Sequence, residues 1–481
     1  CLLTLALMAP HAMSQDISGW SDKTVCRLVK SNGGADYLEE AASRGLDCEV
    51  SVKASKTKAA ISKSSKSKSY SHYGRSLKTW QKGDVTIFDS WNIPQYVKPD
   101  VNDATLAHYF EKERETRIYR DRYQVQPAGN AIQFEFDLKT NAFLTEQMRT
   151  KSLVSYLYYE DGKIIYDEIW PSERHKFIKI NDSTELGSAS VGKSVVSYVV
   201  GHAICEGYVD GLDVKMDDWP LIENTLYEGL PLIDVLNMTA GDQHIINSED
   251  GFIKSGRHFN TKPMKFYIEE ELKGSISSQS KPYNYHGFAT HVAMNYVIFK
   301  AGDNWQNMLD KVFQQKVKIK YKFFFKKHNK ASESSWISEK DGLGWYNTHA
   351  TRYDYLRIAK AMLDDWNDDT CVGQYLKSVY ERRVSKNIGN SAALNKWLKE
   401  ESRMFRNNYR MTQSAKSYGG QFHFDFGGMR NRKILGMSGY GGQSIMIDFD
   451  NSRINVVNAV YTNYDWYELS HQVIKNGKLK D

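Results

Sequence analysis

Strand-like periodicity is clearest between residues 156 and 166. Residues 156–159 and 164–166 are apolar or aromatic, and the turn that joins them contains Asp161 and Gly162. An Asp-Gly pair between two β-rich runs is the strongest short hairpin signal. The pattern therefore predicts two antiparallel strands joined by a tight turn.

The apolar period lengthens from two to about four at Ser190. Val191, Val195, Val199 and Ala203 recur at every fourth position, which is typical of the buried face of a long helix. A sequence pattern typical of helices, interrupted by polar residues, then continues to about residue 366. We therefore expect a helical block after the hairpin.

Strands return in the C-terminal part of the chain. Segments 434–439, 444–448 and 454–457 are apolar runs of strand length, and 466–475 is helical in pattern. A hairpin, a helical block, antiparallel strands and a last helix do not alternate as βαβ units do. The order of elements predicts an α+β fold.

Composition narrows the class of protein. The chain has 481 residues, of which 41% are hydrophobic and 25% charged, which excludes a collagen, a coiled coil and a wholly disordered chain. The net charge is +6, and residues 51–70 contain six lysines and no acid. Because the excess charge lies in one Ser/Lys-rich segment, which we interpret as a linker, we expect no nucleic-acid partner.

The N-terminal residues resemble an export signal. Residues 1–14 contain a short apolar run followed by small residues, and we interpret them as a signal-peptide remnant cut before Gln15. No later stretch reaches 18 uninterrupted apolar residues, so we predict no transmembrane anchor. The prediction is a bacterial protein that is periplasmic or secreted.

The cysteines and domain boundaries follow from this interpretation. Cys26 and Cys48 lie in a segment spanning 15–50, and an oxidising compartment would let them form a disulfide. We expect Cys205 to be a buried thiol and Cys371 a free thiol. The remaining predicted parts are an N-terminal extension, residues 71–147, and a main domain, residues 148–481.

Residues 187–194 satisfy two catalytic or binding motifs at once. Gly187 to Ser194 matches GxxxxGK[ST], a loop that binds nucleotide phosphates. Ser190 and Lys193 also match SxxK, in which the lysine lies one helical turn after the serine and can take its proton. A phosphate loop needs a buried strand leading into its first glycine, whereas residues 176–180 alternate polar and apolar. This favours the serine hydrolase interpretation.

Further segments support this interpretation; they are 190–194, 205–207, 211–213, 232–242, 347–354 and 436–448. Together they resemble the serine β-lactamase and penicillin-binding-protein superfamily, in particular its esterase and 6-aminohexanoate-dimer-hydrolase branch. The resemblance implies an antiparallel sheet flanked by helices with an inserted helical subdomain. The sequence contains no HExxH or CxxC motif, so we expect no metal, and we expect no cofactor.

The resemblance assigns roles within the first two motifs. Ser190 becomes the nucleophile and Lys193 its base, against the local alternative of a helix N-cap serine and a solvated lysine. Aligning the helix that follows places Tyr285 as the proton-relaying tyrosine, with Tyr283 as the alternative. Gly287 stands where the superfamily has Asn or Ser, so one side-chain contact to the lysine or substrate is lost.

The third motif falls at residues 437–439. Met437 replaces the usual basic residue, followed by Ser438 and Gly439, and the oxyanion hole would use the N–H groups of Ser190 and Tyr440. His286 is a candidate for substrate lining or packing.

We therefore predict an exported serine hydrolase that cleaves a small ester or amide through an acyl-enzyme on Ser190. An esterase or amidase is expected rather than a true β-lactamase, unless another cation such as Arg430 or Arg432 reaches the site. The alternatives are a nucleotide-binding protein that uses residues 187–194 and a catalytically silent relative.

Overall fold

A computed structural model describes most of the main domain. It covers residues 122–171, 180–247, 251–259, 262, 264–327, 344–386, 411–460 and 462–480, together with the backbone of short strands between 71 and 88. These short strands form two hairpins, β1 (Ser71–His72) with β2 (Arg75–Ser76) and β3 (Thr79–Lys82) with β4 (Val85–Phe88). The chain divides into units 1–68 and 69–481. The predicted signal peptide, the Cys26–Cys48 pair and the linker lie outside the described residues.

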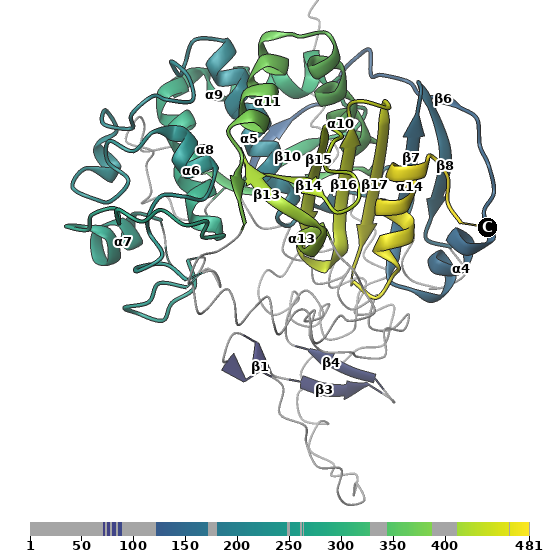
Figure 1. Ribbon diagram of the computed structural model, residues 1–481, viewed down its shortest axis with the longest axis horizontal. Helices are drawn as coiled ribbons and strands as arrows, with labels where there is room; N and C mark the ends of the chain where they lie inside the picture. Colours follow the sequence, from purple (N-terminus) through teal and green to yellow (C-terminus); the bar gives the residue numbers. More distant parts are fainter. Residues whose placement is uncertain are drawn as a thin grey trace, which may run out of the picture. The chain divides into compact units, whose positions relative to one another are not determined.

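The described residues form one large sheet of nine strands, shown in Figure 1. In spatial order the strands are β12 (Val384–Ser385), β13 (Ala415–Gly419), β14 (Phe422–Phe426), β15 (Ile434–Gly439), β16 (Gln443–Asp448), β17 (Arg453–Ala459), β7 (Leu153–Glu160), β8 (Lys163–Ile169) and β6 (Glu135–Phe136). Neighbouring strands are antiparallel, except that β6 and β8 are parallel. Asp161 and Gly162 join β7 to β8 with φ values of 45° and 90°, as a tight hairpin turn requires.

A second, small sheet was not predicted. Its strands in order are β5 (Arg122–Val125), β10 (Phe323–Lys327), β11 (Gly344–Ala350) and β9 (Leu186–Gly187), all antiparallel. Phe323 pairs with Val125, so the partners of β10 are remote in sequence. A short apolar run does not by its own period distinguish such a strand from a helix segment. The prediction of a helical segment up to about residue 366 was therefore wrong for β10 and β11.

Helices cover both faces of the large sheet and produce two cores. On one face lie α5 (Val191–Cys205), α10 (Arg352–Asn367) and α11 (Cys371–Glu381), with α8 (Gly287–Ala301) packed on α5; on the other lie α4 (Ala142–Thr150), η8 (Tyr467–Gln472) and α14 (Val473–Asn476). Strand β7 contributes Leu157 to the first core and Tyr156 to the second. The sheet is therefore buried on both sides, as the α+β prediction required.

The predicted helical subdomain is present between α5 and β10. Its short helices lie beside the large sheet, in the part of Figure 1 that holds α6, α7 and α9. They are η3 (Pro220–Ile222), α6 (Leu232–Leu236), α7 (Met264–Tyr267), η4 (Ile268–Leu272), η5 (Gly302–Asn304), α9 (Trp305–Leu309) and η6 (Asp310–Lys316). Outside this subdomain, two further short helices lie in the C-terminal part, α13 (Met411–Ser414) and η7 (Tyr440–Gly442).

Cys205 and Cys371 form a disulfide, so the expectation of two unpaired thiols was wrong. The bond joins the last residue of α5 to the first residue of α11, across 166 residues of sequence. The two helices pack closely along their length, since a Cβ at Gly201 would lie 2.6 Å from the Tyr375 ring. Nothing in the local sequence around either cysteine indicates this approach of the two helix ends.

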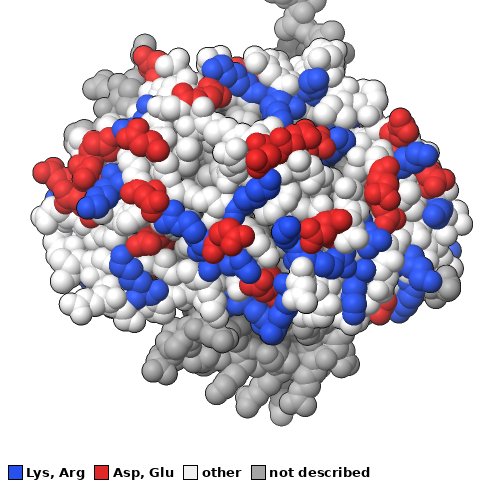
Figure 2. All heavy atoms as spheres, turned by 45° about the horizontal axis from the view of Figure 1, so that its top comes forward, with Lys and Arg blue, Asp and Glu red and all other residues white. Residues whose placement is uncertain are grey.

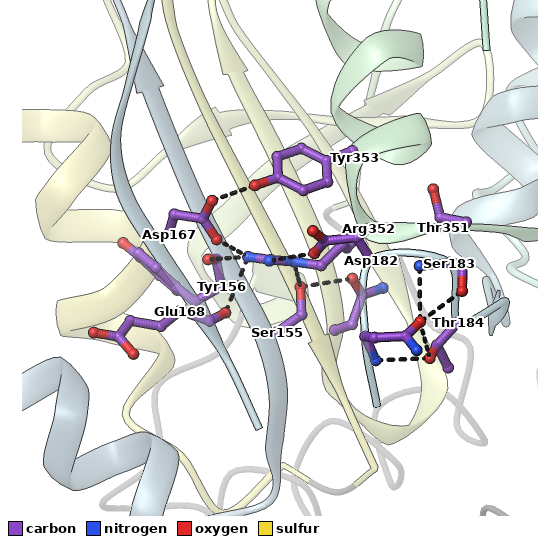
Figure 3. Close-up of polar contacts among 12 residues, drawn as sticks. Ser155, Tyr156, Asp167, Glu168, Asp182, Ser183, Thr184, Thr351, Arg352 and Tyr353 are labelled. Atoms are coloured by element: carbon purple, nitrogen blue, oxygen red, sulfur yellow. Dashed lines mark hydrogen bonds and ion pairs between the residues drawn. The ribbon is translucent and has the colours of Figure 1, made fainter. Parts of the chain in front are cut away.

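Arg352 anchors the start of α10 to the large sheet, as Figure 3 shows. Its side chain is 3% exposed and donates to the Asp167 carboxylate, to Asp182 Oδ1 at 3.1 Å and to Ser155 Oγ at 3.2 Å. The neighbouring Tyr353 hydroxyl also donates to Asp167. Because α10 follows β11 after one residue, this buried cluster also fixes the end of β11.

The surface of the described part carries both signs of charge. Figure 2 shows Lys and Arg interspersed with Asp and Glu over the face in view. No helix in the described ranges is both long enough and apolar enough to cross a membrane.

Candidate active site

Ser190 and Lys193 lie against each other at the start of α5. The Lys193 Nζ donates to the Ser190 Oγ at 3.1 Å. Ser190 is partly exposed and its side chain caps no backbone N–H of the helix, whereas Lys193 is only 1% exposed. The alternative of a capping serine and a solvated lysine does not describe this pair. A buried amine beside an accessible hydroxyl can act as its base.

The loop before Ser190 is held by β11. The Ser188 N–H donates to the Thr348 carbonyl at 2.9 Å, and the Thr348 N–H donates to the Ser188 Oγ at 2.9 Å. Ala189 then adopts a φ of 46°, in the left-handed region that costs energy for a residue with a Cβ. This strained turn connects β9, which ends at Gly187, to Ser190 at the start of α5.

The same residues do not form a phosphate loop. Gly187 belongs to β9, which pairs antiparallel with β11 at the edge of the small sheet. Lys193 points into the protein, and Ser194 Oγ donates to the Gln421 carbonyl at 2.7 Å. Gly192 has a packing role, because a Cβ there would lie 2.2 Å from the Tyr346 carbonyl oxygen. The glycine and lysine of the motif are therefore explained by packing and by the serine–lysine pair.

Two tyrosines surround the lysine amine. The Tyr285 ring centroid lies 4.9 Å from the Lys193 Nζ, as expected if Tyr285 rather than Tyr283 belongs to the second motif. Tyr283 is instead buried against Tyr418, with ring centroids 5.1 Å apart. Tyr346, on β11, accepts a hydrogen bond from the Lys193 Nζ at 3.0 Å. Sequence reasoning missed Tyr346, which lies in none of the family motifs.

A buried carboxylate holds the chain on both sides of Tyr285. Asp242 is 1% exposed and accepts from Asn284 Nδ2 at 2.8 Å, His286 Nε2 at 2.8 Å and the Tyr227 hydroxyl at 2.7 Å. Burial by itself raises the pKa of Asp242, but the contacts from His286, Asn284 and Tyr227 outweigh it and lower the pKa below its ordinary value. Asp242 therefore stays charged and fixes the backbone that carries Tyr285.

His286 has a structural role in the described site. It is fully buried, and its Nδ1 accepts the Ala289 N–H at 3.2 Å, which caps the first turn of α8. With Nδ1 as acceptor, the ring proton lies on Nε2 and is donated to Asp242. These contacts are those of a packing residue, and substrate lining by His286 stays a prediction.

The end of β15 approaches the loop that precedes Ser190. A Cβ at Gly439 would lie 2.6 Å from the Ser188 carbonyl oxygen, so a glycine is required for this contact. Ser438 and Tyr440 beside it are partly exposed, whereas Met437 is fully buried in the core that includes α5. The predicted third motif and the predicted nucleophile are therefore adjacent in space.

Comparison with solved structures identifies the fold. The chain is similar to a provisionally named 6-aminohexanoate-dimer hydrolase from Bacillus anthracis, at 13% identity and a TM-score of 0.50, over 78% of this chain and 93% of that one. The chain has a serine β-lactamase and penicillin-binding-protein fold. No protein-family model and no curated protein matches the sequence.

Two other structures of this fold are also similar. A provisionally named β-lactamase from Bacteroides dorei has 13% identity and a TM-score of 0.48, over 69% of this chain and 96% of that one. The octameric penicillin-binding protein homologue from Pyrococcus abyssi has 14% identity and a TM-score of 0.45, over 70% of this chain and 77% of that one.

The two arginines considered as substitutes for Met437 lie at the wrong end of this β-lactamase-like sheet. Arg432 pairs with Asp448 and donates to the Ile474 carbonyl, beside the C-terminal helix. It precedes β15, seven residues before Gly439, which corresponds to roughly 20 Å along a strand. Arg430 is exposed in the same turn. Neither supplies a cation next to Ser190.

His423 is a further residue near the serine–lysine pair of this β-lactamase-like fold, and the sequence did not indicate it. It is buried on β14, and its Nδ1 has no hydrogen-bond partner among the described residues. Burial, together with the positive charges of Lys386 and Lys193, lowers its pKa well below the ordinary histidine value. His423 is therefore neutral at physiological pH. Its position within a phenylalanine-rich strand gave no chemical signal.

Proposed function

We propose that this protein is a serine hydrolase that cleaves an ester or amide through an acyl-enzyme on Ser190. The observation that carries the proposal is the 3.1 Å contact between the Ser190 Oγ and the buried Lys193 Nζ. Burial disfavours the charged form of an amine, and a base must be neutral part of the time to accept a proton. The fold that the chain shares with a protein named as a 6-aminohexanoate-dimer hydrolase supports a hydrolytic reaction.

The proposed reaction has two steps. Lys193 takes the Ser190 proton while the Oγ bonds to the substrate carbonyl carbon, and the N–H groups of Ser190 and Tyr440 stabilise the resulting oxyanion. As the bond between the carbonyl carbon and the leaving group breaks, the Tyr285 hydroxyl donates its proton to the leaving group and takes the proton held by the Lys193 ammonium, which restores the neutral amine. Water later releases the acyl group from Ser190.

Labelling with a fluorophosphonate probe tests this function. We expect one labelled peptide containing Ser190, and no labelling in a Ser190→Ala variant with an unchanged melting temperature, since the Ser190 side chain caps no helix N–H. Ser183→Ala is the matched control, because Ser183 is an exposed serine seven residues away whose side chain contacts Asn181. Labelling on another serine would disprove the mechanism, and no labelling at all would favour the catalytically silent alternative.

We further propose that the substrates are neutral acyl esters or amides. Penicillin-type substrates carry a carboxylate, and an unpaired buried charge is costly. Met437 provides no cation, and Arg430 and Arg432 lie at the far end of β15.

The expected result is that kcat/KM for a p-nitrophenyl ester exceeds that for a chromogenic cephalosporin by at least about a hundredfold, or roughly 2.7 kcal/mol. The methyl ester of the same cephalosporin is the matched control, because it lacks only the charge, and it should react faster than the free acid. Equal rates for acid and methyl ester would show that some other group pairs the carboxylate.

We also propose that the protein is exported. The Cys205–Cys371 disulfide supports this, because disulfides persist in oxidising compartments and are rare in the cytosol. Intact mass of periplasmic material, measured before and after reduction, tests the proposal, and freely alkylated cysteines in that material would contradict it.

A further inference from the structure

We propose that Tyr346 is a fourth catalytic residue, beside Ser190, Lys193 and Tyr285, whose hydroxyl holds the Lys193 amine and stabilises the ammonium that forms when Ser190 is deprotonated. This inference rests on the proposed acyl-enzyme function. The Tyr346 Oη lies 3.0 Å from the Lys193 Nζ, and the Ser190 Oγ lies 3.1 Å from the same atom. The amine is thus held between two hydroxyls, and Tyr346 is only 7% exposed.

Two glycines on different helices make room for Tyr346. A Cβ at Gly192, on α5, would lie 2.2 Å from the Tyr346 carbonyl oxygen. A Cβ at Gly287, on α8, would lie 3.0 Å from the Tyr346 Cε1 and 2.7 Å from the Phe259 ring. The resemblance predicted that Gly287 costs the site one side-chain contact, to the lysine or to the substrate. Tyr346 lies against Gly287 and supplies a contact to the lysine from strand β11.

The tyrosine is held in this orientation from several sides. Its ring packs edge-on against His291, with centroids 5.2 Å apart. Its strand, β11, is bonded to the nucleophile loop through Thr348 and Ser188. The far end of β11 is fixed through the buried Arg352. The same strand therefore sets the positions of both Ser190 and Tyr346, which is a preorganised arrangement.

The proposed role follows from the charge that develops during acylation. As the Ser190 Oγ bonds to the substrate carbonyl carbon, its proton moves to the lone pair of the Lys193 Nζ, and the amine becomes an ammonium. A hydrogen bond from an ionised donor is stronger than one from a neutral donor. The contact to Tyr346 is therefore worth more in the transition state than in the ground state, and it raises kcat rather than lowering KM.

Tyr285 and Tyr346 would then have different tasks. The ring of Tyr285 faces Lys193, but the described residues give its hydroxyl no hydrogen-bond partner. That hydroxyl remains available for the leaving group, whereas the Tyr346 hydroxyl is committed to the amine. Loss of Tyr285 should harm poor leaving groups most, and loss of Tyr346 should harm all leaving groups alike.

The test is Tyr346→Phe, which keeps the ring and removes the hydroxyl. We expect kcat for p-nitrophenyl acetate to fall about 10- to 100-fold, with KM changed less than about twofold. Without the phenol as acceptor, the ammonium form of Lys193 is less favoured, so the acidic limb of the kcat/KM profile should move to lower pH. Tyr375→Phe is the matched control. It removes a buried hydroxyl that lies 2.7 Å from Ser197 Oγ, and Ser197 is on α5, the helix that also carries Lys193.

The outcomes separate this inference from the function it rests on. If wild-type Ser190 is not labelled by a fluorophosphonate, the proposed function fails. If it is labelled, and Tyr346→Phe keeps the wild-type kcat and pH profile, only the role of Tyr346 is disproved. A fall in kcat without a shifted acidic limb, matched by Tyr375→Phe, would indicate packing alone and also overturn the inference. Should Tyr346→Phe not fold, Gly287→Ala displaces the ring instead and should lower kcat with the same pH shift.

Discussion

Lys193→Ala is expected to lower the rate of acylation of Ser190 by about a thousandfold. Removing a positioned general base typically costs two to four orders of magnitude, and here the Ser190 Oγ has the Lys193 Nζ as its partner at 3.1 Å. The loss should appear in the single-turnover release of p-nitrophenol from p-nitrophenyl acetate and in the rate of fluorophosphonate labelling. KM should change far less, because the amine is buried behind the serine.

Lys193→Arg sharpens this prediction. Arginine keeps a positive charge in the site but does not lose its proton in proteins, so this variant should be as slow as Lys193→Ala. Lys377→Ala, which removes a partly exposed lysine paired with Asp369, should acylate at the wild-type rate. Undiminished acylation in Lys193→Arg would show that a charge, rather than a base, is required. Lost ATP affinity with normal acylation would instead revive the nucleotide-binding alternative.

Removing the Cys205–Cys371 disulfide is expected to lower the free energy of unfolding by about 5 kcal/mol. The bond closes a loop with a sequence separation of 166 residues, and the chain-entropy model assigns a loop of that length roughly this stabilisation. The cause is mainly the restricted unfolded chain, so the folded arrangement of α5 and α11 should persist. Guanidinium unfolding of wild-type protein and of a Cys205→Ser/Cys371→Ser variant measures the difference.

Reduction provides the control for that comparison. Cys371 is exposed, so dithiothreitol should reach the bond and shift wild-type protein to the unfolding midpoint of the double variant. The double variant should itself respond little to the reductant, apart from any contribution of Cys26 and Cys48. Identical midpoints for oxidised wild-type protein and the double variant would show that the bond does not stabilise the fold.

The features that the sequence predicted correctly depend on residues close together in the chain. The hairpin β7–β8 was predictable because Asp161 and Gly162 supply the positive φ values that its turn requires. The start of α5 and the contact between Ser190 and Lys193 were predictable because residues three apart lie on one face of a helix. Tyr285 followed from the family resemblance, once the helix just after it, α8, was aligned. Each of these features depends on neighbours within a few residues.

Only the tertiary structure revealed the contact of Tyr346 with Lys193 and the Cys205–Cys371 disulfide. Tyr346 lies 153 residues from Lys193, and Cys205 lies 166 residues from Cys371, so no local period relates the members of either pair. Strand β11 reaches Lys193 because glycines at 192 and 287 leave space for it, and a glycine in a sequence does not say which distant residue will fill that space. Local chemistry was thus set by short-range spacing along a helix, whereas the second partner of the lysine depends on how remote strands and helices pack.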